Sequence, residues 1–254
     1  MEDKDKLTGR NFWIEFWKKY TPKKIPHNVP FSKFLPNLKD GGNMIEIGGF
    51  PGIFTAYFYK NGIDNVSLLD YYIDENIVRR NEEINNIPPN TISCIETDFF
   101  TFKPEKKFDV VFSFGFIEHF ENIEEVIHKH IELLSVNGRL MITLPNFRGL
   151  NGFVQKIFDK ENLRAHNLNC MNPELLESIA LNFGLKNVVV EYGGNPSIWL
   201  DESRNGVLIC MLTKIINRTL NLLPPVRKVS TLGRFLSPYI FLYAENNFIK
   251  KADE

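Results

Sequence analysis

The chain has 254 residues, of which 43% are hydrophobic and 24% are charged, as is ordinary for a globular protein with a full core. Its formal net charge of −1 argues against nucleic-acid binding, which usually accompanies a strongly basic composition. The three cysteines, Cys94, Cys170 and Cys210, are far apart and odd in number, so we expect neither a disulfide framework nor a metal site.

The first ten residues, MEDKDKLTGR, are charged and lack the apolar core of a secretory signal. No run of about 18 uncharged apolar residues predicts a membrane-spanning helix. We therefore expect a cytoplasmic location.

Short apolar runs alternate with helical patterns through the first 145 residues. Continuous apolar runs of this length are typical of parallel strands that are buried on both faces. The expected strands are 43–48, 65–70, 91–96, 108–113 and 138–144, and the expected helices are 52–60, 74–86 and 121–134. This alternation predicts an α/β fold with a parallel sheet.

The alternation changes after this point. Residues 145–170 form a mixed segment that is too long for a plain connection in a compact domain. Asn172 and Pro173 are a good N-cap and first position for a helix that ends near Gly184. Two further strands are expected, at 186–192 and 237–245.

The glycine-rich segment MIEIGGFPGIF, residues 44–54, ends the first strand and opens the first helix. Ligands of open α/β sheets bind at the carboxyl ends of strands near the point where the strand order reverses. A dinucleotide site places glycines at positions n, n+2 and n+5, but counting from Gly48 the later places hold Phe50 and Ile53. Counting from Gly49 fails in the same way, so an oxidoreductase is disfavoured.

The segment from Glu46 to Gly52 resembles motif I of the class I S-adenosylmethionine-dependent methyltransferases, in which an acid in the strand precedes a glycine loop. The resemblance implies that the Glu46 carboxylate lies near the amino group of the cofactor. It also implies that Gly48, Gly49 and Gly52 form the loop beside the cofactor. Phe50 stands where the family has its middle glycine.

The resemblance continues in order over residues 43–146. It implies that Asp70, at the end of the second strand, accepts hydrogen bonds from the ribose hydroxyls and that Tyr71 lies against adenine. Asp98 would receive the adenine amino group, and the Phe99 backbone would serve a ring nitrogen. The segment FDVVFSFGFIEHF resembles a fourth motif, whose residues at the methionine end would be Ser113, Phe114 and Gly115.

The fold implied by the resemblance is a Rossmann-like α/β fold. It has a seven-stranded, mostly parallel sheet with helices on both faces, an antiparallel last strand and helical cap insertions. We expect one domain over residues 1–254, comprising an N-terminal helical cap (1–40), a cofactor-binding half (41–145) and a substrate-side half (146–254), with insertions near 146–170 and 200–235.

The implied activity is the transfer of a methyl group from S-adenosyl-L-methionine to an oxygen, or a nitrogen, of a small-molecule acceptor. A catalytically silent relative, which binds the cofactor only as a structural or regulatory partner, is the alternative.

Histidines are the candidates for catalysis, because a hydroxyl acceptor needs a base. His119 follows the fourth strand, beside Glu118, and His166 lies in the long segment after the fifth strand. Either can also be a structural residue. Glu118 can orient a partner or cap the next helix, and we expect His128 and His130 to face solvent.

Segments near the two ends of the chain can cover the site. The aromatic residues of 11–31 predict either a lid over the cofactor cleft or a helix packed on the sheet edge. Residues 203–244 contain six basic and no acidic residues, with apolar residues at helical spacing. Such a segment can contact an anionic membrane surface or an acidic or lipid-linked acceptor, or can pack on the sheet as a cap. The sequence does not predict the oligomeric state.

Overall fold

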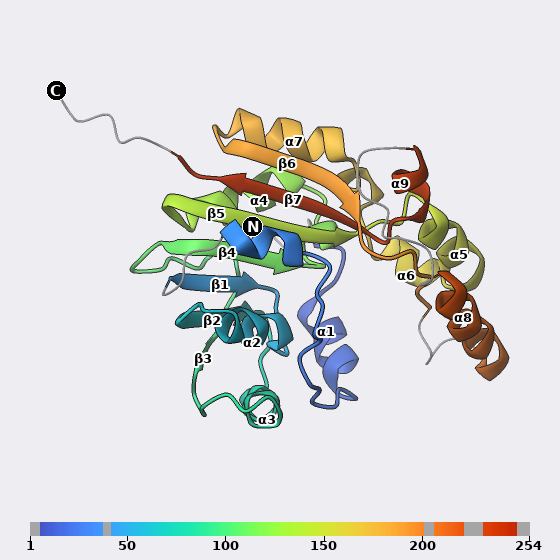
Figure 1. Cartoon of the computed structure of the whole chain (residues 1–254), viewed down its shortest axis with the longest axis horizontal. Helices are drawn as coiled ribbons and strands as arrows, with labels where there is room; N and C mark the ends of the chain where they lie inside the picture. Colours follow the sequence, from blue (N-terminus) through green and yellow to red (C-terminus); the bar gives the residue numbers. More distant parts are fainter. Residues whose placement is uncertain (1–5, 38–41, 201–205, 221–230, 248–254) are drawn as a thin grey trace.

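The computed structural model describes residues 6–37, 42–200, 206–220 and 231–247. These residues form a central sheet with helices on both faces (Figure 1). The sheet has seven strands in the order β3-β2-β1-β4-β5-β7-β6, and only β7 runs antiparallel to its neighbours. The predicted seven-stranded, mostly parallel sheet with an antiparallel last strand is confirmed.

Six of the seven strands begin and end within two residues of the expected positions, but the fifth begins at Leu134, four residues before the expected 138. They are β1 (Asn43–Ile47), β2 (Asn65–Asp70), β3 (Ile92–Glu96), β4 (Phe108–Phe114), β5 (Leu134–Pro145), β6 (Lys186–Gly193) and β7 (Tyr239–Glu245). β1 pairs with β2 on one side and with β4 on the other, so the strand order reverses between β1 and β4. The carboxyl ends of these strands therefore frame the place where an open α/β sheet binds its ligand.

The helices also follow their sequence signals. The α-helices are α1 (Arg10–Trp17), α2 (Ile53–Lys60), α3 (Glu75–Ile84), α4 (Ile123–Glu132), α5 (Leu150–Phe158), α6 (Lys160–Arg164), α7 (Pro173–Asn182), α8 (Val207–Leu220) and α9 (Thr231–Leu236). The described part of the chain also contains the short 3₁₀-helices η2 (Ser32–Asn37), η3 (Ile117–His119) and η4 (Leu168–Cys170). The predicted cap is present at α7, where the Asn172 side chain accepts a hydrogen bond from the Glu174 amide.

The sheet separates two apolar cores, because successive side chains of a strand point to opposite faces. Ile45 and Val111 belong to one core, together with apolar side chains of α4 and α7. Met44 and Phe112 belong to the other, together with side chains of α2 and α3. Glu46 is two residues from Met44 on β1 and so points toward α2, which decides its partners in the site.

Parts of the expected caps, at 1–5, 38–41, 201–205 and 221–230, lie outside the described residues. Among the helices that are described, none has the length and apolar character needed to cross a membrane.

Candidate functional site

A cavity of about 630 Å³ lies at the carboxyl ends of β1, β2 and β4. Its volume falls in the range of roughly 300–1,000 Å³ that is usual for small-molecule sites. Of the residues predicted to bind the cofactor, those that line it are Glu46, Gly48, Gly49, Asp70, Tyr71, Asp98, Phe99, Phe114 and Gly115.

Two predicted cofactor residues, Ser113 and Gly52, do not line the cavity. Ser113 is fully buried, on the face of β4 opposite Phe112 and Phe114, and its hydroxyl oxygen has no hydrogen-bond partner among the described residues. Gly52 has a φ of +86° and ends the loop at the start of α2. Gly52 therefore shapes the loop through its backbone, in a conformation that favours glycine.

The Glu46 carboxylate joins the glycine loop to the start of α2. Its Oε2 atom accepts hydrogen bonds from the Thr55 amide, at 2.7 Å, and from the Thr55 hydroxyl. A Cβ atom on Gly49 would overlap the Glu46 side chain, so any larger residue there would displace the carboxylate. Burial raises the pKa of Glu46 to about 8, against the opposite effect of the hydrogen bonds from Thr55.

The Asp70 carboxylate joins the same loop to the end of β2. It accepts hydrogen bonds from the amides of Phe50 (3.0 Å) and Tyr71 (2.7 Å). Burial raises its pKa to about 6, so the group is ionised at pH 7. A carboxylate has about four acceptor positions, and those left on Asp70 can serve hydroxyl groups of a ligand in the cavity.

The segment before α1 crosses the cavity, and the sequence did not indicate which of its residues contact the site. The Lys6 ammonium lies 2.6 Å from Asp98 Oδ2 and 4.5 Å from the centre of the Tyr71 ring. The Leu7 amide donates to the His119 carbonyl at 2.9 Å. A ligand that uses Asp98 must therefore displace Lys6 or share the carboxylate with it. From α1, Trp13, Phe16 and Trp17 also line the cavity, so this segment covers it and is not confined to the sheet edge.

His119 lines the cavity, whereas His166 lies behind it with its ring centre 4.7 Å away. Nδ1 of His119 is 3.1 Å from the Ala165 carbonyl, and Nδ1 of His166 is 2.6 Å from the Asn162 carbonyl. A nitrogen facing a carbonyl must carry the hydrogen, so Nε2 of each ring is the acceptor when the ring is neutral. Burial, and to a lesser extent His166, lower the pKa of His119 to about 3.

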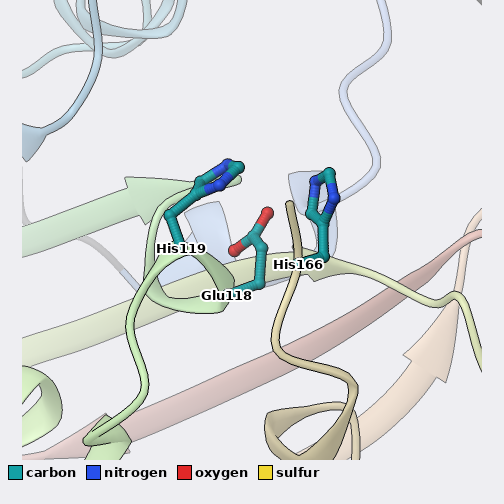
Figure 2. A group of neighbouring side chains, drawn as sticks. All are labelled: Glu118, His119 and His166. Atoms are coloured by element: carbon teal, nitrogen blue, oxygen red, sulfur yellow. The ribbon is translucent and has the colours of Figure 1, made fainter. Parts of the chain in front are cut away.

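Glu118 completes this group (Figure 2), with its carboxylate beside the two imidazole rings. Its Oε2 atom is buried and has no hydrogen-bond partner among the described residues, and burial raises its pKa to about 8. One atom from each of Glu118, His119 and His166 lies within 4.8 Å of the others, a donor set of the kind that Zn²⁺ accepts. The expectation of no metal site stays a prediction.

We expect Glu118→Gln to reduce the loss of stability between pH 6.5 and 8. An unfolded Glu118 ionises near pH 4.5, whereas the folded protein keeps this proton to about pH 8, so rising pH favours the unfolded chain. The buried histidines have the opposite effect only below about pH 6.5, the ordinary pKa of histidine. The slope that one such carboxyl contributes is about 1.4 kcal/mol per pH unit.

The measurement is urea unfolding at several pH values with a chelator present, so that bound metal does not contribute. Glu124→Gln is the control, because Glu124 is exposed in the same part of the chain. Equal slopes for wild type and Glu118→Gln would mean that Glu118 ionises normally in the folded protein.

The expectation that His130 faces solvent is wrong. His130 is fully buried, its Nδ1 lies 2.7 Å from the Val126 carbonyl, and the rings of Phe99 and Phe116 pack against it. The signal was present in the sequence, because His130 lies three residues after Ile127 on the apolar stripe of α4. His128 is exposed, as expected.

Comparison with known proteins identifies the family. A family model described as a methyltransferase domain matches residues 17–190, which is more than half of the chain. A search of curated proteins found no match.

Three solved structures share the fold. A SAM-dependent methyltransferase from Archaeoglobus fulgidus has 17% sequence identity and a TM-score of 0.55, with 84% of this chain and 90% of that chain covered. The N-methyltransferase NodS from Bradyrhizobium japonicum WM9, in complex with S-adenosyl-L-homocysteine, has 13% identity and a TM-score of 0.51 over 96% of this chain and 95% of that chain. Phosphoethanolamine N-methyltransferase 2 from Haemonchus contortus has 17% identity and a TM-score of 0.53 over 94% of this chain but only 53% of its own.

The motifs at the strand ends, the strand order and the family match all agree. The chain belongs to the methyltransferase family, and it is an enzyme whose cofactor is S-adenosyl-L-methionine.

Proposed function

We propose that this enzyme transfers the methyl group of S-adenosyl-L-methionine to an oxygen, or a nitrogen, of a small acceptor that carries an acidic group or is linked to a lipid. The observation that carries the proposal is that three carboxyl groups and His119 line one cavity. When bound, the cofactor supplies a methyl group on a positively charged sulfur atom, which needs no further activation.

The residues of the cavity fit this cofactor. Its ammonium, ribose hydroxyls and adenine amino group are all hydrogen-bond donors, and Glu46, Asp70 and Asp98 provide acceptors along one wall. Gly49, where a Cβ would meet Glu46, keeps the loop close to that carboxylate. The proposal includes these contacts of the three acidic residues and the glycine loop with the cofactor. It also includes the contacts of Tyr71 and the Phe99 backbone with adenine.

His119 is proposed to hold the acceptor rather than to remove its proton completely before transfer. A base works best when its pKa is near the working pH, and a pKa of about 3 makes His119 a weak base. Its neutral Nε2 atom can still accept a hydrogen bond from the acceptor and orient the attacking atom. His166, which packs behind His119, acts in this proposal as a positioning residue.

Basic side chains in the lining of the cavity favour an acceptor with an anionic group. Lys23 and Lys24 line the cavity, and Asn81 of α3 holds both the Lys23 amide and the Pro51 carbonyl of the glycine loop. Trp13 packs edge-on against His119 with ring centres 5.0 Å apart. Lysine ammonium groups bind phosphate and carboxylate groups well, and the aromatic side chains exclude water from the reaction. The Haemonchus contortus enzyme, one of the structural neighbours, is in complex with the phosphorylated amine phosphomonomethylethanolamine.

The test is a screen for release of S-adenosylhomocysteine. Hydroxyl and amine compounds that carry phosphate or carboxylate groups, free or lipid-linked, are compared with their uncharged counterparts. We expect turnover with charged members and little with neutral ones. Cofactor binding without turnover on any acceptor would favour the catalytically silent alternative. Equal turnover on neutral compounds would contradict the proposal that the acceptor carries an acidic group.

A further inference from the structure

Three helices at one end of the molecule expose an unusual amount of apolar surface. α5, α8 and α9 gather beyond the carboxyl end of β5 (Figure 1). We call their exposed apolar side chains the apolar end; they are Phe153, Ile157, Phe158, Leu208, Met211, Leu212, Ile215, Ile216, Leu232 and Phe235. Large contiguous apolar patches on a protein surface mark interaction sites.

The exposed face of α8 is its apolar face. Leu208, Met211, Leu212, Ile215 and Ile216 follow the i, i+3, i+4, i+7, i+8 spacing of one helix face, and each is at least 42% exposed. One alternative from the sequence was that this apolar face packs on the sheet as a cap. The structure has it facing outward, so its apolar spacing needs another explanation.

Polar side chains hold the inner faces of these helices in place. On α8, Asn217 forms two hydrogen bonds with the backbone of Ile198, at 2.7 and 2.8 Å. On α5, the buried Asn151 and Gln155 bond the neighbouring backbone at Ser197 and Trp199. Both helices thus hold the same segment after β6 with polar side chains, while most of their large apolar side chains are exposed.

Positive charge predominates in the segments that carry the apolar end and in α6 beside α5. In residues 146–164, 206–220 and 231–236, the exposed charged side chains are seven basic and one acidic, Glu161. The basic ones are Arg148, Lys156, Lys160, Arg164, Lys214, Arg218 and Arg234. On α8, Lys214 and Arg218 are four residues apart and border the apolar face. Arg204, Arg227 and Lys228, which add to the charge of 203–244 in the sequence, lie outside the described residues.

We propose that the apolar end binds the surface of a membrane that contains anionic lipids. An amphipathic helix with a basic border lies in the interface, with its apolar side chains among the acyl chains and its cations at the headgroups. A second copy of the chain fits less well, because a symmetric dimer through this surface would bring the basic side chains that border it, such as Lys214 and Arg218, close to their counterparts in the other copy. The charge therefore favours anionic lipid.

This surface goes beyond the proposed chemistry, since a membrane contact requires neither the cofactor nor an acceptor. It also bears on the source of the acceptor. α5 follows β5 directly, and the carboxyl ends of β4 and β5 point toward this end of the molecule (Figure 1). A lipid-linked acceptor would therefore approach from the side on which the cavity lies.

The experiment is flotation of the purified full-length protein with vesicles, without cofactor or acceptor. Vesicles of phosphatidylcholine alone are compared with vesicles that also contain phosphatidylglycerol. We expect recovery with the anionic vesicles, little with the neutral ones, and a decrease as salt rises. The double variant Leu212→Ser/Ile215→Ser should lower partitioning by about tenfold or more. Arg218→Glu, which reverses the charge, should lower partitioning by about fivefold or more.

The matched control is Val136→Ser/Leu181→Ser, which changes two apolar residues that are 54% and 53% exposed but lie outside the three helices. It should float like wild type, and thermal unfolding confirms that each variant is folded. Absence of flotation with anionic vesicles, or equal flotation of the Leu212→Ser/Ile215→Ser variant, would overturn the proposal. So would a stable dimer in solution that the same double substitution dissociates.

Discussion

Replacing Asp70 with alanine is expected to weaken the binding of S-adenosylhomocysteine by about 30- to 1,000-fold, which corresponds to a loss of roughly 2–4 kcal/mol. Asp70 lines the cavity at the end of β2, and its carboxylate is ionised at pH 7. Charge-assisted hydrogen bonds to ribose hydroxyls would be lost. The variant also frees the Phe50 amide of the glycine loop, which adds to the expected effect.

Calorimetric titration measures this affinity, and circular dichroism establishes that the variant is folded. Asp70→Asn separates the two contributions, because the amide oxygen can still accept from the loop while the charge is removed. Asp64→Ala is the control, since Asp64 is exposed just before β2. A folded Asp70→Ala variant with wild-type affinity would show that Asp70 does not contact the cofactor.

Most of the parallel strands could be predicted to within a residue. The central strands β1 and β4 are short apolar runs that are buried on both faces, so their hydrophobic signal does not depend on what packs against them. β5 begins four residues before the expected position 138. The expected strand 65–70 and helix 52–60 match β2 and α2 within a residue. Because ligand sites of such sheets lie at the carboxyl ends of strands, the family motifs after the second and third strands led us to expect Asp70 and Asp98 beside one cavity.

Which face of a helix turns inward was harder to predict. Helical spacing in α8 identifies an apolar face but does not say whether that face meets the sheet. The face of α8 that turns inward is the one that carries Asn217, because Asn217 forms hydrogen bonds with the backbone of Ile198, nineteen residues away. A polar residue in a helix gives no signal of such a partner, because the bond exists only in the folded chain.

The contacts of single charged residues in the N-terminal segment could not be predicted either. Lys6 was one of several charges in MEDKDKLTGR, and only the fold brings it to Asp98, 92 residues away.

Ser113 is the opposite case, a residue that was predicted at the site but does not line the cavity. The motif places it at the cofactor, but the alternation of side chains along β4 sends Phe112 and Phe114 to one face and Ser113 to the other.

Replacing His119 with alanine is expected to lower kcat by about 100-fold, because a misplaced acceptor loses the alignment that in-line transfer needs. The affinity for S-adenosylhomocysteine should change little, since His119 is assigned to the acceptor. Burial keeps the pKa of His119 near 3, so the ring is neutral above about pH 5. Turnover should therefore show no rise near pH 6.5 that depends on His119.

The measurement is kcat against pH for wild type, His119→Ala and His166→Ala, with the exposed His128→Ala as the control. His166→Ala should have a smaller effect than His119→Ala, because His166 reaches the cavity only through the ring of His119, 4.7 Å away. A kcat within tenfold of wild type for His119→Ala would make His119 structural. A rise near pH 6.5 that vanishes in His119→Ala would instead identify His119 as a base that titrates normally once the acceptor is bound, because only a ring that gains and loses its proton in that range produces such a rise.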